Sequence, residues 1–265
     1  MCSVILVPLL LNPLYTGNIY WQSLQLSPYI GIHRMEDKKY SCEYIERNKA
    51  VSGCFAMFML FVGITFIPFF LKDGAELMAK GLLFPIIVTL EFIFIVPLYY
   101  IFFRKREGLG LGSFRFKTFF ILFLLILLIQ YLLPYISGVN ETESWSESRM
   151  ALGGYIFWIN AILLIFIAPV YEEIIFRGCL FNITYFWFGN NVFGTAVIVS
   201  VMFSVVHLQY TEIRTFIVLF LVSLTLSAAR VKSRGLLMPV LLHILMNAVV
   251  TGIQYAAYML PASSG

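Results

Sequence analysis

Two neighbouring acids and an arginine interrupt an otherwise apolar part of the chain, in the sequence "PVYEEIIFRG". An ionised side chain near the centre of a bilayer costs at least about 3 kcal/mol on insertion scales, so such a cluster needs a structural or chemical reason. Glu173 and Arg177 are four residues apart with the acid first, the favourable order for an ion pair on a helix. Glu172 points about 100° away from Glu173 and has no built-in partner. We therefore expect Glu172 to be available as a base.

Two histidines and an asparagine lie downstream at helical spacing. "FSVVH" places Phe203 and His207 four residues apart, and "HILMN" does the same for His243 and Asn247, so each pair shares a helix face. Glu172 and His207 are nearly equidistant from the turn-like sequence "GNN" between them. A helical hairpin at this turn brings both to one depth, and two further crossings bring His243 there. Separately, a buried histidine could be structural and the asparagine could join helices. Their convergence favours chemistry.

The composition identifies a membrane protein. Of 265 residues, 60% are hydrophobic and only 12% are charged, and the mean hydropathy is +0.88. A soluble domain carries roughly twice that share of charged residues, and a bilayer span needs about 20 apolar residues. We predict an all-α, polytopic transmembrane bundle of about seven spans, or eight if one short intramembrane helix is added. The expected spans lie within residues 50–71, 81–103, 119–139, 151–171, 178–211, 215–229 and 235–265.

The distribution of charge predicts the orientation. With the N-terminus inside, most Lys and Arg residues fall in inner segments, as the positive-inside rule requires. The acidic sequence "NETESWSES" then faces outwards. The net charge of +4 therefore reflects topology, and we expect no nucleic-acid partner. We predict an integral membrane protein with a cytoplasmic N-terminus, located in the plasma membrane if the source is a prokaryote.

Three regions are expected. Residues 1–49 form a cytosolic or interfacial arm, and translation that starts at Met35 is one hypothesis for it. Residues 50–150 supply three spans without a recognised motif, and residues 151–265 hold the catalytic core. Glu91, the one charge in its span, is expected to make a hydrogen bond between packed helices.

The three motifs together resemble a known family. "EEIIFRG" is similar to the EExxxR motif, "FSVVH" to FxxxH and "HILMN" to HxxxN of the type II CAAX prenyl endopeptidases and their bacterial relatives, the CPBP (CAAX protease and bacteriocin-processing) intramembrane proteases. The order is the same, each motif lies on a separate expected helix, and the resemblance covers roughly residues 150–250. It implies that Glu172 and His207 activate a water molecule, and that His243 and Asn247 stabilise the oxyanion. Glu173, Arg177 and Phe203 would support these four residues.

The expected function is therefore that of an integral-membrane endopeptidase acting on membrane-associated or lipidated substrates, as in CAAX or bacteriocin-precursor processing. The alternative is a non-catalytic scaffold, or a bacteriocin-immunity or regulatory partner, with the same fold. Peptide or protein substrates and the lipid bilayer are the expected partners. Glu172, His207 and His243 could also hold zinc with an open position for water. Family members are described both as metalloprotease-like and as glutamate-dependent without metal, so a divalent metal such as zinc stays open, and no other cofactor is expected.

Overall fold

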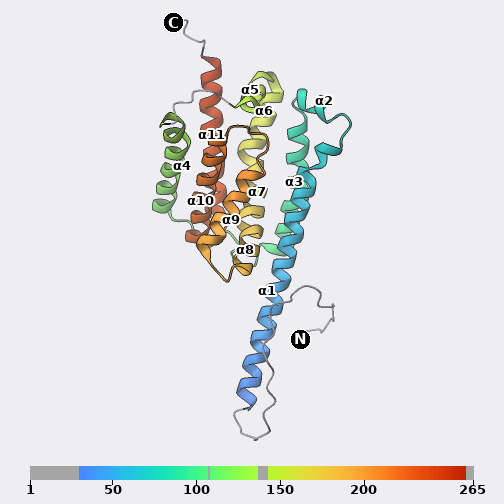
Figure 1. Cartoon of the computed structure of the whole chain (residues 1–265), viewed down its shortest axis with the longest axis vertical. Coiled ribbons are helices and arrows are strands. Elements are labelled where there is room, and N and C mark those ends of the chain that lie inside the picture. The colour runs from blue at the N-terminus through green and yellow to red at the C-terminus, as the bar shows by residue number, and fades with distance from the viewer. Residues whose placement is uncertain (1–29, 107, 137–142, 261–265) are drawn as a thin grey trace. The chain divides into compact units, whose positions relative to one another are not determined.

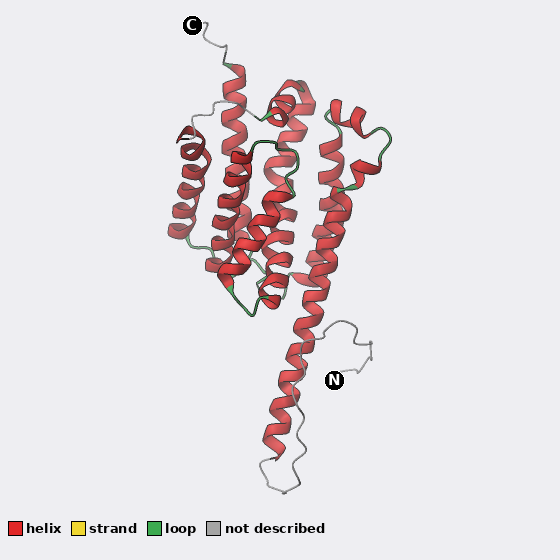
Figure 2. Ribbon diagram, in the orientation of Figure 1, coloured by secondary structure: helices red, strands yellow, loops and turns green. Residues whose placement is uncertain are grey.

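The computed structural model describes residues 30–106, 108–136 and 143–260, with only the backbone for residues 30–44 and 46. All regular elements in these ranges are helices (Figures 1 and 2). The chain divides into two compact units, residues 1–50 and 51–265. Within the first unit only the beginning of α1 is described. The expected N-terminal arm and the start at Met35 thus lie largely outside the described residues, and the division into three regions stays a prediction.

The helices follow one another with short connections. Their bounds are α1 Ile30–Thr65, η1 Ile67–Phe70, α2 Gly74–Ala79, α3 Leu83–Leu98, η2 Tyr99–Phe103, α4 Phe116–Ile136, α5 Ser144–Ala151, α6 Gly154–Ile162, η3 Leu163–Ile167, α7 Ala168–Glu173, η4 Ile174–Leu180, α8 Phe181–Trp187, α9 Val192–Val205, α10 Ile213–Ser233 and α11 Leu237–Met259. η1 is a 3₁₀ turn, whereas η2, η3 and η4 are π-helical turns that continue a neighbouring α-helix.

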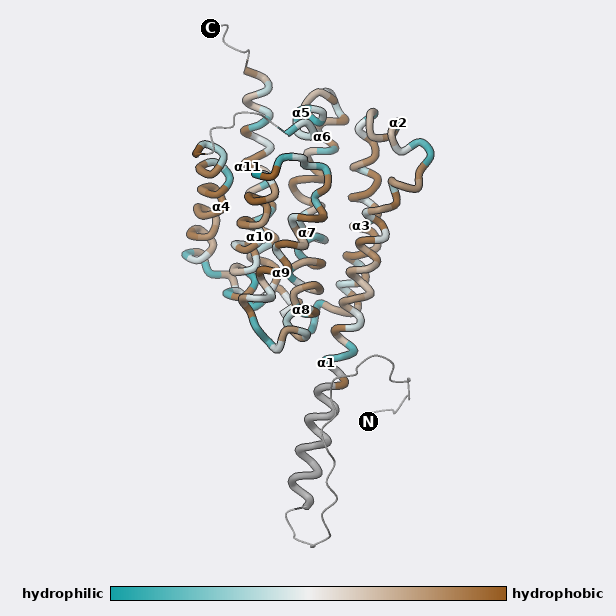
Figure 3. Tube along the Cα trace, viewed as in Figure 1, coloured by the Kyte–Doolittle hydropathy of each residue, from teal (hydrophilic) through white to brown (hydrophobic). Residues whose placement is uncertain are grey.

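Six helical segments of the described chain are long and apolar enough to cross a membrane. They are Arg47–Thr65, Leu83–Phe103, Phe116–Ile136, Gly154–Trp187, Ile213–Ser233 and Leu237–Met259. Figure 3 shows that apolar residues dominate these helices, with polar residues gathered towards the connections. α9 is also apolar, but its 14 residues reach only about 21 Å at 1.5 Å per residue. The prediction of an all-α polytopic bundle is confirmed.

One predicted boundary is wrong. We expected a span to end at residue 171 and the next to begin at residue 178, but a single helical segment runs from Gly154 to Trp187. The acids and Arg177 lie inside this segment instead of at its end. They are tolerated there because Glu173 and Arg177 are buried against each other, so neither charge has to reach water.

The hairpin predicted around "GNN" is present (Figure 1). α8 ends at Trp187, and Gly189 and Asn190 take positive φ angles of 60° and 66° in the turn. Asn191 caps α9, since its side-chain oxygen accepts a hydrogen bond of 3.0 Å from the Gly194 N–H. The turn sends α9 back along the helix that carries Glu172.

Two apolar clusters position the site. The larger one includes Phe61 of α1, Ile95 of α3, Phe176 of η4 and Phe203 of α9. The rings of Phe176 and Phe203 meet edge to face, with centroids 5.1 Å apart. The second cluster joins α4, α10 and α11. α10 packs against α9, α4 and α11 and so connects the two clusters.

Candidate active site

Glu173, Arg177 and His243 form one buried hydrogen-bonded group. Glu173 and Arg177 are completely buried, and His243 is 4% exposed. Arg177 Nη1 donates to Glu173 Oε1 over 2.9 Å, and His243 Nδ1 donates to the same oxygen over 2.8 Å. The ion pair expected from the spacing is present. The bond from His243 was not anticipated, and it means that Glu173 fixes the histidine ring as well as the arginine.

The guanidinium of Arg177 is held from two further sides. Its Nη2 donates to the Oγ of Ser223 on α10 over 2.8 Å and to the carbonyl oxygen of the same residue over 3.3 Å. Its central carbon lies 4.5 Å from the centroid of the Phe203 ring, which is a favourable cation–π distance. Phe203 was expected to support the site, and the structure shows that it does contact Arg177. The contact between Arg177 and Ser223 was not indicated by any sequence motif.

Glu172 faces the other nitrogen of His243. Its Oε2 lies 3.8 Å from His243 Nε2, and its side chain is 17% exposed, whereas that of Glu173 is not exposed. The imidazole therefore lies between two carboxylates. Because Nδ1 carries the hydrogen donated to Glu173, neutral His243 presents a bare Nε2 to Glu172. Only the imidazolium form could donate from Nε2.

His207 lies just beyond the end of α9. Its Nδ1 is 2.6 Å from the Phe203 carbonyl oxygen, and because a carbonyl only accepts, Nδ1 carries the hydrogen. Neutral His207 therefore has a free acceptor at Nε2. The Phe203 ring contacts both histidines, with centroid distances of 4.5 Å to His207 and 6.0 Å to His243. Glu172 and His243 both act electrostatically on His207, which places it in the same cluster.

Asn247 joins two helical segments, which is the structural alternative that the sequence left open for it. The π-helical register of η3 directs the Ala168 N–H to the Leu163 carbonyl. In this register the next donor, for the Leu164 carbonyl, would be Pro169, which has no N–H. Asn247 Nδ2 donates to that carbonyl oxygen over 2.9 Å. One amide hydrogen is thus engaged in holding the helix, and the second remains for a ligand.

Both π-helical turns of this segment flank the acid pair, with η3 before α7 and η4 directly after Glu173. Such turns occur frequently at functional sites because an extra residue re-aims the side chains. The sequence offered one clue to the first turn, Pro169 within an apolar run.

Sequence reasoning also missed how close Glu91 lies to this cluster. Glu91 is 3% exposed and accepts a hydrogen bond of 2.7 Å from Thr65 Oγ1, which confirms the expected bond between helices. It also shares a hydrogen bond with the side chain of Tyr171, the residue before Glu172. An acid inside an apolar span was the available signal, but nothing in the sequence linked it to Tyr171.

The segment after His207 is fastened by Glu143. This carboxylate accepts hydrogen bonds from the N–H groups of Thr211 and Glu212, over 3.2 and 3.3 Å, and from the hydroxyl of Thr215. Partial burial raises the pKa of Glu143, but these hydrogen bonds outweigh it, and its pKa lies below the ordinary value. Glu143 thereby holds the backbone at the start of α10, at the end of the segment that connects His207 to this helix.

The predicted zinc ligands do not make a metal site here. Among the described residues, no group of three His, Cys, Asp or Glu side chains is arranged to hold a metal ion. Glu172 Oε2 and His243 Nε2 lie 3.8 Å apart, but no third ligand is arranged with them to complete a metal site among these residues. We therefore derive no step through a metal.

Comparison with known proteins matches the region that holds the site. Residues 154–249 fit the family model described as "Type II CAAX prenyl endopeptidase Rce1-like". This range contains all seven residues that the motifs singled out, from Glu172 to Asn247. Residues 154–249 are therefore similar to an Rce1-like domain.

A protein of Escherichia coli named "Uncharacterized 24.3 kDa protein" is 43% identical to this chain over 101 residues. The match covers 37% of this chain and 44% of that protein, so the chain spans less than half of this relative's length. No solved structure matches the chain. The similarity to this family therefore rests on residues 154–249 and the three motifs within them.

Proposed function

We propose that the chain is an integral-membrane endopeptidase in which Glu172 is the general base. The observation that carries the proposal is the chain of contacts Glu172–His243–Glu173–Arg177, in which a partly exposed carboxylate faces an imidazole that a fully buried ion pair holds in place. A purely structural knot would need Glu173 and Arg177 alone. Glu172 adds a partly exposed carboxylate beside His243, and this supports its assignment as the base.

The reaction proceeds in two steps. Glu172 takes a proton from a water molecule, whose oxygen attacks the carbonyl carbon of the peptide and forms a tetrahedral intermediate. When the C–N bond breaks, the same carboxyl group returns the proton to the departing amine nitrogen. His207 supports the first step, because its Nδ1–H is engaged by the Phe203 carbonyl and its free Nε2 can accept a hydrogen bond from the water.

The negative charge of the intermediate needs donors. His243 in its imidazolium form presents Nε2–H, and Glu173 stabilises that form through Nδ1. The second amide hydrogen of Asn247 is the other candidate donor. Glu173 and Arg177 do not touch the reacting atoms in this scheme. They position His243. Once Glu172 has taken the proton, the positive charges of Arg177 and His243 balance the negative charges of Glu173 and the oxyanion.

We propose peptides at the membrane as substrates, and the family name points to CAAX-type, prenylated chains or, as in the bacterial relatives, peptide precursors. The test compares the peptides that accumulate in membranes of cells that make the wild type or Glu172→Gln. Glu76→Gln, at an exposed salt bridge with Lys80, is the matched control. The proposal is supported by peptides that are found in cells that make the wild type or Glu76→Gln and are missing from cells that make Glu172→Gln. Identical peptide sets in all three would refute it.

A second candidate is a non-catalytic membrane partner built on the same fold. The bond from Asn247 to the Leu164 carbonyl favours it, since this gives a motif residue a purely architectural use. If the chain has this second function, cells that make Glu172→Gln should show the same phenotype as cells that make the wild type.

A further inference from the structure

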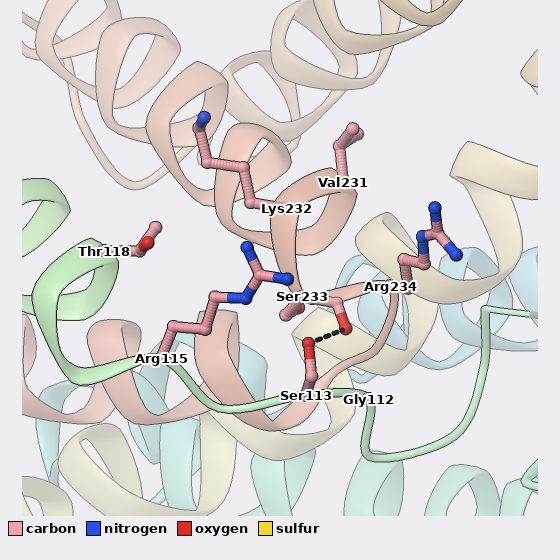
Figure 4. A pocket seen from close by; sticks show the side chains of 8 residues that line it. All are labelled: Gly112, Ser113, Arg115, Thr118, Val231, Lys232, Ser233 and Arg234. Carbon is pink, nitrogen blue, oxygen red and sulfur yellow. Dashed lines mark hydrogen bonds between the residues drawn. The ribbon is translucent and has the colours of Figure 1, made fainter.

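A basic cavity lies between the end of α10 and the start of α4, away from the residues of the active site. Its volume is about 690 Å³. Three cations and three hydroxyl groups line it: Arg115, Lys232, Arg234, Ser113, Thr118 and Ser233. Figure 4 shows that these side chains come from both segments.

Among the described residues, nothing compensates the charge in this cavity. Within those ranges no acidic side chain lines it, and none of Arg115, Lys232 and Arg234 forms an ion pair. Three like charges repel one another, and an anion placed among them removes that repulsion. Basic residues are common at one end of membrane helices. That tendency alone does not explain why three of them line the same cavity.

The cavity is held open by backbone contacts. Residues 110–113 pair with residues 233–237 through three hydrogen bonds: Ser113 N–H to the Ser233 carbonyl (2.8 Å), Leu236 N–H to the Gly110 carbonyl (2.9 Å) and Leu237 N–H to the Leu111 carbonyl (3.1 Å). Gly112 has a φ of +74°, and a Cβ there would lie 2.5 Å from the Ser233 oxygen. Only glycine permits this approach. The walls are therefore fixed before any ligand binds.

The start of α4 adds donors to the cations. The first N–H groups of a helix lack intrahelical partners and carry partial positive charge, which favours phosphate. Arg115 immediately precedes α4, and the hydroxyl of Thr118 lies in its first turn. The Ser233 carbonyl, near the end of α10, already accepts hydrogen bonds from Ser113 N–H and Oγ, so it is satisfied.

We propose that this cavity binds the phosphate of an anionic phospholipid headgroup. The lipid is favoured over a free anion because the cavity lies at the ends of two membrane-spanning helices. Apolar side chains of α4 stand next to it, with Phe116 71% and Phe120 57% exposed. A headgroup phosphate in the cavity would place its acyl chains along this exposed side of α4. This site is independent of the proposed peptidase activity.

The test measures lipid binding to the full-length protein in detergent micelles by native mass spectrometry. The probes are dioleoyl-phosphatidylglycerol, dioleoyl-phosphatidylcholine and inorganic phosphate. The pocket variant is Arg115→Gln with Lys232→Gln. The control, Arg104→Gln with Lys105→Gln, removes the same charge from residues that do not line the cavity.

The wild type and the control should bind a first phosphatidylglycerol molecule more tightly than phosphatidylcholine. Only the cations that line the cavity contact the bound headgroup. With roughly a fivefold factor for each cation removed, the pocket variant should bind phosphatidylglycerol about 25-fold more weakly than the control. Equal weakening in the control would show diffuse surface attraction and would overturn the proposal. It would also be overturned if phosphatidylcholine bound as tightly, or if inorganic phosphate matched phosphatidylglycerol, which would indicate a free-anion site.

Discussion

Removal of the Arg177 guanidinium should destabilise the protein severely. In Arg177→Ala, Glu173 loses its ion pair while it stays completely buried, and Ser223 loses its donor. Breaking one partner of a buried pair typically costs about 3 to 5 kcal/mol, because the remaining charge is uncompensated. At roughly 2 to 4 °C per kcal/mol for a chain of about this size, we expect the melting temperature to fall by about 6 to 20 °C.

The double variant Glu173→Gln with Arg177→Met separates charge from packing. It removes both charges and keeps side chains of similar length, and such replacements are often neutral for stability. Its melting temperature should therefore lie well above that of Arg177→Ala. Lys80→Ala is the control, since its salt bridge with Glu76 is exposed and should contribute at most about 1 kcal/mol.

The assay is thermal unfolding of the purified proteins in one detergent, followed by intrinsic fluorescence. The reasoning would be refuted if Arg177→Ala unfolded within about 2 °C of the wild type, a margin of about 1 kcal/mol. It would also fail if the double variant were as unstable as Arg177→Ala, because the loss would then come from packing rather than from an unpaired Glu173.

Three further predictions concern other parts of the chain. Cysteines at Ser144 and Lys105 should react with impermeant reagents from opposite sides of the membrane, outside for Ser144, and labelling of both from one side would contradict the predicted topology. The folded-state pKa of Glu143 is lowered, so its contribution to stability is complete above the unfolded-state value and is lost as the pH falls through the folded-state value. Acidification below the ordinary value of 4.5 should therefore reduce the protection of the Thr211 amide, measured as its hydrogen-exchange rate relative to the intrinsic rate at the same pH, whereas Glu143→Gln should show low protection at every pH. Glu91→Gln should lower the cleavage rate by altering Tyr171 while leaving the fold intact, and an unchanged rate would restrict Glu91 to helix packing.

The sequence predicted the parts of this molecule that depend on local pattern. Apolar runs indicated the membrane helices, the "GNN" turn indicated the hairpin, and the i, i+4 spacing indicated the pair of Glu173 with Arg177. These features follow from helical geometry and from the cost of charge in lipid.

The parts that could not be predicted depend on contacts between distant segments. His243 bonds to Glu173, 70 residues away in sequence, and Asn247 bonds to Leu164 because a π-helical turn and a proline leave that carbonyl without its usual donor. No single-helix pattern encodes such a register change. The helix boundary expected near residue 171 failed for a related reason, since burial of the ion pair allowed the helix to continue.

The central claim, that Glu172 is the base, is tested most directly by the cleavage rate of Glu172→Gln in proteoliposomes, measured on the peptides found to depend on the wild type. Glutamine keeps the shape of the side chain but cannot accept the proton, so the rate should fall by about 10²- to 10⁴-fold, the usual contribution of a general base. The melting temperature should stay within about 2 °C of the wild type, because Glu172 is partly exposed and outside the buried ion pair. A Glu172→Gln protein that cleaves these peptides at the wild-type rate would contradict the account.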